Sequence, residues 1–156
     1  SGTAYSCMEN PYIDPSGEIA AFRDSTGRHL PLLCVSNLAN GYNEILKRFG
    51  LSHEEFSRLV RKTRAGNDGR VLIPWYEGER TPDLPLAAPL TFGFGPGDFT
   101  PEIFCRAVLE GHVLNLQHGF SKMPVRVREL RLTGGLSQSP AWRQTIAFLQ
   151  DELGVM

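Results

Sequence analysis

The sequence has few of the features that mark metal sites, disulfide scaffolds or nucleic-acid binding. Its three cysteines, Cys7, Cys34 and Cys105, are odd in number and far apart, which argues against a disulfide framework and for a reducing compartment. Neither Cys-x-x-Cys nor His-x-x-x-His occurs, so we expect no metal site. Sixteen basic and seventeen acidic residues give a net charge of −1, which offers no electrostatic case for nucleic acid or an anionic membrane.

Long apolar runs are also missing. None approaches the roughly 18–20 residues that cross a membrane. The first residues show no charged-then-apolar signal segment. We therefore expect a cytoplasmic protein that has neither a nucleic acid nor a membrane as its partner.

The composition is that of one folded domain. The chain has 156 residues, enough for a single core, and its apolar share of 41% argues against disorder. The chain opens on Ser1 rather than methionine, and structured sequence follows at once. We therefore expect one domain of a longer protein.

Three strands are predicted in the first part of the chain, over residues 2–8, 18–23 and 29–35. Turn residues separate them, with Asn10-Pro11 before the second strand and Asp24 to Gly27 before the third. Strands that follow one another with short connections predict an antiparallel meander.

Helical periodicity begins after the third strand. Apolar residues recur at helical spacing over 38–50, where Gly50 can end the helix. Ser52 and Glu55 have the spacing of a capping box, which predicts a second helix over 53–62.

The second half of the chain alternates strands and helices. A short strand is predicted at 71–73, an irregular Pro- and Gly-rich stretch over 74–99, and a helix capped by Thr100 over 100–121. A strand at 130–132 and a helix after Pro140 follow. The whole order predicts an α/β domain in which helices pack on a mixed sheet.

The segment 130–144 is the most informative part of the sequence. Its strand leads into Gly134 and Gly135, and Ser139-Pro140 then opens a helix. Glycines before a helix start let the backbone approach a phosphate or nucleotide closely. The alternative is a tight connection that binds nothing.

Four segments resemble, in order, motifs of the C-terminal domain of the FGGY carbohydrate kinases, most closely the xylulokinase branch. They are a phosphate turn at Ser1–Ala4, a Pro-x-x-x-Gly-Glu-Arg-Thr-Pro stretch at Pro74–Pro82, a signature helix at Arg106–Gly111, and an adenosine motif at Gly134–Gln144.

The resemblance implies a ribonuclease-H-like, actin-like ATPase fold. Members have two such domains and transfer the γ-phosphate of Mg-ATP to a sugar hydroxyl in the cleft between them. Residues 1–156 would be the C-terminal nucleotide-binding domain, and an N-terminal domain absent from this sequence would bind the sugar. The favoured reaction converts D-xylulose to xylulose 5-phosphate, with ATP and Mg²⁺ as its cofactors.

The resemblance also assigns roles to single residues. Gly2 and Thr3 would cradle the β- and γ-phosphates. Gly134 and Gly135 would face the α-phosphate and ribose. Ser139 would cap the last helix with its side chain and contact the adenine.

A further expectation concerns the long irregular stretch at 74–99. Glu79 and Arg80 would form an ion pair that holds this loop near the cleft, or else a solvated surface pair worth ~0–1 kcal/mol. Trp142 is expected to pack rather than to stack on a nucleotide. The catalytic base would lie upstream of Ser1, so the isolated chain should bind ATP weakly and should not turn over.

Several positions depart from the family pattern. Leu136 stands where a third glycine is usual, Ala4 replaces a serine of the phosphate turn, and Ile103 replaces a polar residue. After Ala147 the sequence no longer matches the pattern.

Other interpretations stay open. The chain could be a non-catalytic actin-like module that binds a nucleotide or a protein partner, or an unrelated α/β binding domain whose glycines are only turns. The sugar could also be ribulose, gluconate or glycerol. An apolar face left uncovered by the missing domain would favour a homodimer.

Overall fold

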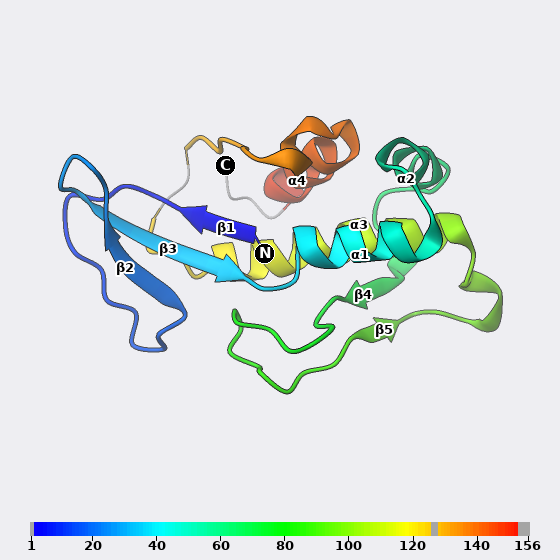
Figure 1. The fold of residues 1–156 in the computed structure, drawn as a ribbon, viewed down its shortest axis with the longest axis horizontal. Helices are drawn as coiled ribbons and strands as arrows, with labels where there is room; N and C mark the ends of the chain where they lie inside the picture. The colour runs from blue at the N-terminus through cyan, green and yellow to red at the C-terminus, as the bar shows by residue number, and fades with distance from the viewer. Residues whose placement is uncertain (1, 126–127, 153–156) are drawn as a thin grey trace.

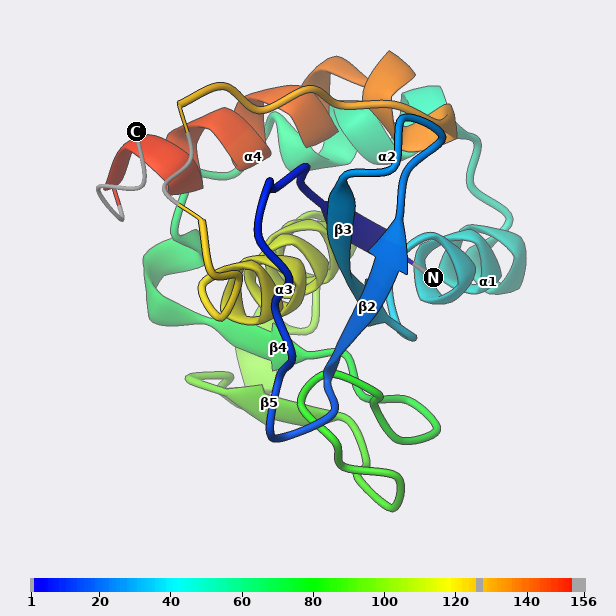
Figure 2. The same ribbon diagram turned by 90° about the vertical axis from the view of Figure 1, so that its left-hand side faces the viewer.

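The computed structural model describes residues 2–125 and 128–152 (Figure 1). A three-stranded sheet lies at one end of the molecule, and the long helix α3, Pro101–Phe120, runs from it through the middle. Helices α1, Ala39–Phe49, and α2, His53–Val60, lie around α3 at its far part, and α4, Pro140–Glu152, lies above it (Figures 1 and 2). None of these helices is long and apolar enough to cross a membrane.

The first sheet is antiparallel, and its central strand is the third in the chain. Its members are β1, Gly2–Tyr5, β2, Ile19–Arg23, and β3, His29–Val35. They lie in the order β1-β3-β2, whereas a meander would place β2 in the middle. The expected meander is therefore wrong in its strand order. A tight turn joins β2 to β3, but the segment 6–18 is long enough to carry the chain past β3 from one edge to the other.

Alternate residues of β3 form one buried face. Pro31, Leu33 and Val35 are buried. This face packs on α3, where the Leu33 methyl carbon would lie only 2.6 Å from a Cβ at Gly119. Glycine at this position therefore lets the helix lie close against the sheet.

The predicted C-terminal end of α1 and the predicted start of α2 are confirmed, while α2 ends at Val60 rather than at residue 62. Gly50 ends α1 in the left-handed conformation, with φ of 62°. At the start of α2, the Ser52 hydroxyl accepts from the Glu55 N–H at 3.1 Å, and the Glu55 carboxylate accepts from the Ser52 N–H at 2.8 Å. Both signals are local in sequence, which is why they predict the helix ends well.

A second, two-stranded antiparallel sheet covers the other side of α3. It pairs β4, Val71–Ile73, with β5, Leu90–Phe92. Sequence analysis predicted β4 but left β5 inside an irregular stretch. Two 3₁₀ turns flank the pair, η1 at Asn67–Gly69 and η2 at Pro96–Asp98. Gly111 of α3 admits β4 closely, because a Cβ there would overlap the Leu72 carbonyl oxygen.

The segment between α3 and α4 differs from the prediction. Leu130–Leu132 is irregular chain, and the described residues offer it no pairing strand. Alternating leucines alone do not make a strand, because a strand needs a neighbour for its backbone groups. The 3₁₀ turn η3, Gly135–Gln138, then leads into α4.

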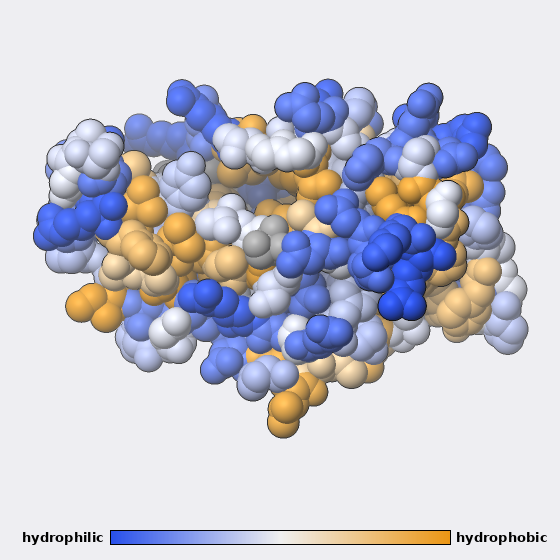
Figure 3. Space-filling view, in the orientation of Figure 1, coloured by the Kyte–Doolittle hydropathy of each residue, from blue (hydrophilic) through white to orange (hydrophobic). Residues whose placement is uncertain are grey.

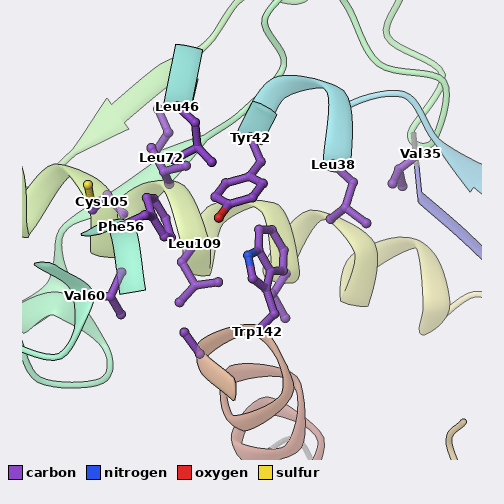
Figure 4. Packing of buried hydrophobic residues seen from close by; sticks show 14 residues of the cluster. Val35, Leu38, Tyr42, Leu46, Phe56, Val60, Leu72, Cys105, Leu109 and Trp142 are labelled. Carbon is purple, nitrogen blue, oxygen red and sulfur yellow. The ribbon is translucent and has the colours of Figure 1, made fainter. Parts of the chain in front are cut away.

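The main core lies between α1, α2, α3 and α4 (Figure 4). Trp142, Tyr42 and Phe56 are its largest fully buried side chains. The rings of Tyr42 and Trp142 meet edge to face, with centroids 5.1 Å apart. The expectation that Trp142 packs is therefore confirmed.

Candidate functional site

One cavity of about 1580 Å³ opens between the edge of the first sheet and the segment that precedes α4. Gly2 and Thr3 line it from β1. Gly134, Gly135 and Ser139 line it from the other end of the chain. In Figures 1 and 2 the segment 128–139 lies across from β1, on the same side as α4. The structure thus brings all five predicted nucleotide contacts around one hollow.

Gly2 is held in place by packing. A Cβ at this position would overlap the Leu38 side chain, which is itself buried at the start of α1. Of the predicted phosphate turn, Ser1 lies outside the described residues, and the backbone at Gly2 lies against the connection between β3 and α1.

Thr3 stands next to Gly2 on the free edge strand of the first sheet. It lies opposite Cys34 of β3, and its hydroxyl contacts the Cys34 sulfur at 3.8 Å. The Thr3 side chain is exposed and borders the cavity. Its hydroxyl is therefore accessible to a bound group.

Gly134 and Gly135 differ in whether the fold requires a glycine at that position. Gly134 has φ of 85° and ψ of 179°, a backbone conformation that is essentially restricted to glycine. Gly135 has no such conformation, and a Cβ there would meet no atom within 4 Å. Nothing in the described part of the chain requires a glycine at 135, so the requirement would have to come from something that enters the cavity.

Ser139 does not cap α4 as expected. Its backbone carbonyl accepts from the Arg143 N–H at 3.1 Å, but its hydroxyl is enclosed and has no hydrogen-bond partner among the described residues. The Arg143 side chain instead ties down the preceding turn through the carbonyls of Ser137 and Gln138. Ser139 thus lines the cavity, with its hydroxyl enclosed in the wall.

Cationic side chains that the sequence analysis did not single out also line the cavity. They are Arg61 at the end of α2, and Arg128 and Arg131. Arg131 is paired with Glu129 at 2.9 Å. Isolated arginines carry no sequence signal, because their meeting at one cavity depends on tertiary structure.

The aromatic residue in the cavity wall is closely packed. Trp142 lines the cavity and is 1% exposed. Figure 4 shows Tyr42 and Trp142 pointing toward one another from α1 and α4. The Tyr42 hydroxyl lies 2.9 Å from Nδ1 of His53, and burial raises the pKa of Tyr42.

The expected ion pair between Glu79 and Arg80 is wrong. The Glu79 side chain is 3% exposed, and its carboxylate accepts from the backbone N–H of Arg80 at 2.7 Å, while the Arg80 side chain is exposed. Neither residue lines the cavity. The reason is that the loop folds back on itself, with Glu79 and Leu84 bridged through their backbones, so the carboxylate turns inward.

The charge of Glu79 is stabilised inside the protein. Burial raises the pKa of this carboxyl, but hydrogen bonds from the N–H groups of Ser36 and Arg80 and from the side chains of Asn37 and Asn115 outweigh burial. The net result is a pKa below the ordinary value. Glu79 is therefore an anion that hydrogen bonds, rather than a salt bridge, hold in place.

The described residues contain no cluster of three His, Cys, Asp or Glu side chains suited to a metal ion. His112 of α3 is fully buried. Its Nδ1 lies 2.6 Å from the Val108 carbonyl, and burial lowers its pKa to about 4.

Comparison with known proteins agrees with this fold and its motifs. Residues 14–149 match the model of the "FGGY family of carbohydrate kinases, C-terminal domain". The chain is 32% identical over 150 residues to the xylulose kinase of Haemophilus influenzae, covering 94% of this chain and 30% of that protein. It is 31% identical over 109 residues to a gluconokinase of Bacillus licheniformis, covering 67% of this chain and 21% of that protein.

Solved structures include the xylulose kinase from Bifidobacterium adolescentis, with a TM-score of 0.78 and 30% identity over 90% of this chain and 28% of that one. The chain thus spans about 30% of the length of these two xylulose kinases. The α/β, actin-like ATPase fold expected from the motifs is confirmed by these likenesses. The match over most of its length shows that this chain belongs to the FGGY family of carbohydrate kinases, in the part that forms their C-terminal domain.

Proposed function

We propose that residues 1–156 form the ATP-binding domain of a sugar kinase that phosphorylates D-xylulose. The observation that carries the proposal is the common cavity, because the two glycine segments that line it come from opposite ends of the chain. Catalysis of phosphoryl transfer consists mainly of positioning and charge stabilisation, which bare backbone N–H groups and nearby cations supply.

The proposed roles are those that the family resemblance implies, and they are supported by the fact that all five residues line one cavity. Gly2 and Thr3 contact the β- and γ-phosphates through their backbone N–H groups, and Thr3 also contacts them through its hydroxyl. Gly134 and Gly135 contact the α-phosphate and ribose. Ser139 contacts the base from the cavity wall. Mg²⁺ arrives with the triphosphate as part of the substrate.

Arg61 and Arg128 add positive charge to the cavity wall. We assign them to the neutralisation of the phosphates, since guanidinium groups bind phosphate well. We place the general base and the sugar contacts in a part of the parent protein outside this chain. The isolated chain should therefore bind ATP without transferring its phosphate.

Xylulose is the favoured sugar because relatives named xylulose kinase match over most of the chain. Gluconate is the second candidate, supported by the match to a gluconokinase over 109 residues. The three free thiols, Cys7, Cys34 and Cys105, suit the cytoplasm, where we place the protein.

The first test is a calorimetric titration of the chain with Mg-ATP. We expect Gly135→Leu to weaken binding at least tenfold, because its side chain would occupy cavity space. Gly97→Leu is the matched control, since Gly97 also has open space around its Cβ position and lies away from the cavity. Equal affinity of the wild-type chain and Gly135→Leu would refute the site.

The second test is a kinase assay on the parent protein that contains this domain, with D-xylulose and D-gluconate as competing acceptors. We expect the larger kcat/KM for xylulose. A larger value for gluconate would reassign the substrate, and no ATP-dependent phosphorylation of either sugar would favour a non-catalytic module.

We further propose that the isolated chain self-associates through the three-stranded sheet. Apolar side chains gather over this sheet in Figure 3, and Tyr5 and Phe22 are 59% and 53% exposed. Sedimentation equilibrium should show a dimer that Phe22→Asp dissociates, and a monomeric wild-type chain would exclude it.

A further inference from the structure

The carboxylate of Glu79 is the meeting point of three segments that are distant in sequence. From the connection between β3 and α1 it accepts the backbone N–H groups of Ser36, at 2.5 Å, and Asn37, at 3.2 Å, and the Asn37 side chain at 3.1 Å. From α3 it accepts the Asn115 side chain at 2.7 Å, and from its own loop the Arg80 N–H at 2.7 Å.

The donors around Glu79 are themselves tied together. Asn37 donates to the Gly78 carbonyl at 2.7 Å, and Asn115 accepts from the Trp75 indole N–H at 2.9 Å. Asn37 and Asn115 are both buried. The long loop is thus fixed to α3 and to the start of α1 through one buried polar network.

The network lies directly behind the predicted phosphate turn. Asn37 immediately precedes Leu38, whose side chain fills the space where a Cβ of Gly2 would be. On the same loop, the Thr81 hydroxyl donates to the Cys34 carbonyl at 3.0 Å, and Cys34 is the partner of Thr3 across the sheet. Glu79 therefore contacts the backbone at 36 and 37, and the next residue, Leu38, packs against the turn at Gly2.

We propose that Glu79 is a positioning residue that holds the phosphate turn at Gly2-Thr3 in place by fixing the connection between β3 and α1. The positioning itself is a property of the fold. Its effect on a ligand rests on the proposed ATP-binding function. Glu79 touches no substrate in this assignment, because it does not line the cavity.

Only a carboxylate fits the centre of this network. An ionised carboxylate is purely an acceptor, whereas a glutamine has one acceptor oxygen and an NH₂ group that would face N–H donors. Glu79→Gln keeps the size and shape of the side chain, and it leaves buried donors without an acceptor. The substitution thus tests the network without creating a cavity.

The decisive experiment is amide hydrogen exchange on the wild-type chain and two variants. In Glu79→Gln we expect the amides of β1, none of which contacts Glu79, to exchange at least tenfold faster. Asp98→Asn is the matched control, since the Asp98 carboxylate accepts from Gly95 at 2.8 Å and pairs with Arg70 at 2.8 Å, away from the cavity. It should leave β1 unchanged.

The proposal is overturned if exchange in β1 is unchanged in Glu79→Gln, or if it rises to the same extent throughout the chain. Should Glu79→Gln fail to fold, Asn115→Ala makes the same test, because it removes one donor and keeps the carboxylate. We expect it to speed exchange in β1 about threefold, and no change there would equally overturn the proposal.

A titration with Mg-ATP distinguishes the positioning role of Glu79 from the proposed ATP-binding function. We expect Glu79→Gln to raise the Kd for ATP about tenfold and Asp98→Asn to leave it unchanged. If the wild-type chain does not bind ATP, the proposed function fails, and the exchange rates still decide the positioning role. If β1 exchanges faster while the Kd stays the same, Glu79 does not position the turn for ATP.

Discussion

The two sides of the cavity are built in opposite ways. On the β1 side, Gly2 is enclosed by Leu38, and the backbone behind it is fixed by the Glu79 network. On the other side, Gly135 has open space around it, and the Ser139 hydroxyl has no partner among the described residues. One side is determined by the protein's own packing, and the other is left with unused space and an unused hydrogen-bonding group.

This contrast separates two meanings of glycine in a binding motif. A glycine required by internal packing says little about a ligand, because a larger side chain there would harm the fold in any case. A glycine that the fold does not require and that also lines a cavity points more directly to a ligand that must come close. By this criterion Gly135 is better evidence of a ligand than Gly2.

The largest expected effect comes from acid and concerns His112, which is buried on α3 beside Tyr76 and Trp142. The pKa of His112 is about 4 in the folded chain, because of burial, against an ordinary value of 6.5. The unfolded chain therefore gains a proton first as the pH falls. The stability that neutral His112 contributes is complete above pH 6.5 and lost as the pH falls to about 4, a loss of about 3 kcal/mol.

Urea unfolding from pH 7 to pH 4 measures this loss, with His112→Gln as the comparison that removes the titrating group. The wild-type chain should lose about 3 kcal/mol more than the variant over this range. Parallel pH profiles would contradict the assignment of a buried, neutral His112.

Next in size is Gly2→Ala, which we expect to lower the free energy of unfolding by about 2 kcal/mol, because its methyl group would overlap Leu38. Chemical denaturation measures the change. In a Leu38→Ala background the same substitution should cost clearly less, as a double-mutant cycle would show. Equal costs in both backgrounds would mean that Leu38 is not what excludes a side chain at position 2.

A smaller loss is expected for Gly134→Ala on the open side. The backbone at 134 has φ of 85°, which alanine adopts only with strain, but the surrounding turn is exposed and can relax. We expect a loss of about 1 kcal/mol in the free energy of unfolding. The melting temperature checks it, and a loss as large as that for Gly2→Ala would remove the contrast between the two sides.

The smallest effect on stability should come from Gly135→Ala, since neither backbone conformation nor neighbouring atoms oppose a methyl group there. We expect a change within about 0.5 kcal/mol. A clear loss of stability would show that the fold itself requires glycine at 135, and Gly135 would then no longer point to a ligand.

Sequence analysis predicted best the features that are set by neighbouring residues. The strand at 29–35, the capping box of Ser52 and Glu55, and the Thr100 cap, whose hydroxyl accepts from the Ile103 N–H, are all found in the structure. In each case the backbone groups and their partners lie within a few positions of one another. The local sequence therefore determines most of the interactions that form these features.

Features that depend on distant partners were predicted less well. A strand was expected at 130–132, but the described residues place no strand beside it. The Glu79 carboxylate was assigned to its neighbour Arg80, whereas it binds donors from positions 36, 37 and 115. The four motifs identified the family correctly because they preserve order along the chain, which does not depend on knowing these pairings.

The protein's two tryptophans lie in different parts of this arrangement. Trp142 forms part of the cavity wall, and Trp75 belongs to the Glu79 network through its indole N–H. Replacing either one by phenylalanine leaves a single tryptophan, whose emission can be excited separately from that of the four tyrosines. Emission from Trp142 would then report on occupancy of the hollow, and emission from Trp75 on the integrity of the loop, so the two halves can be followed separately by light without attaching a label.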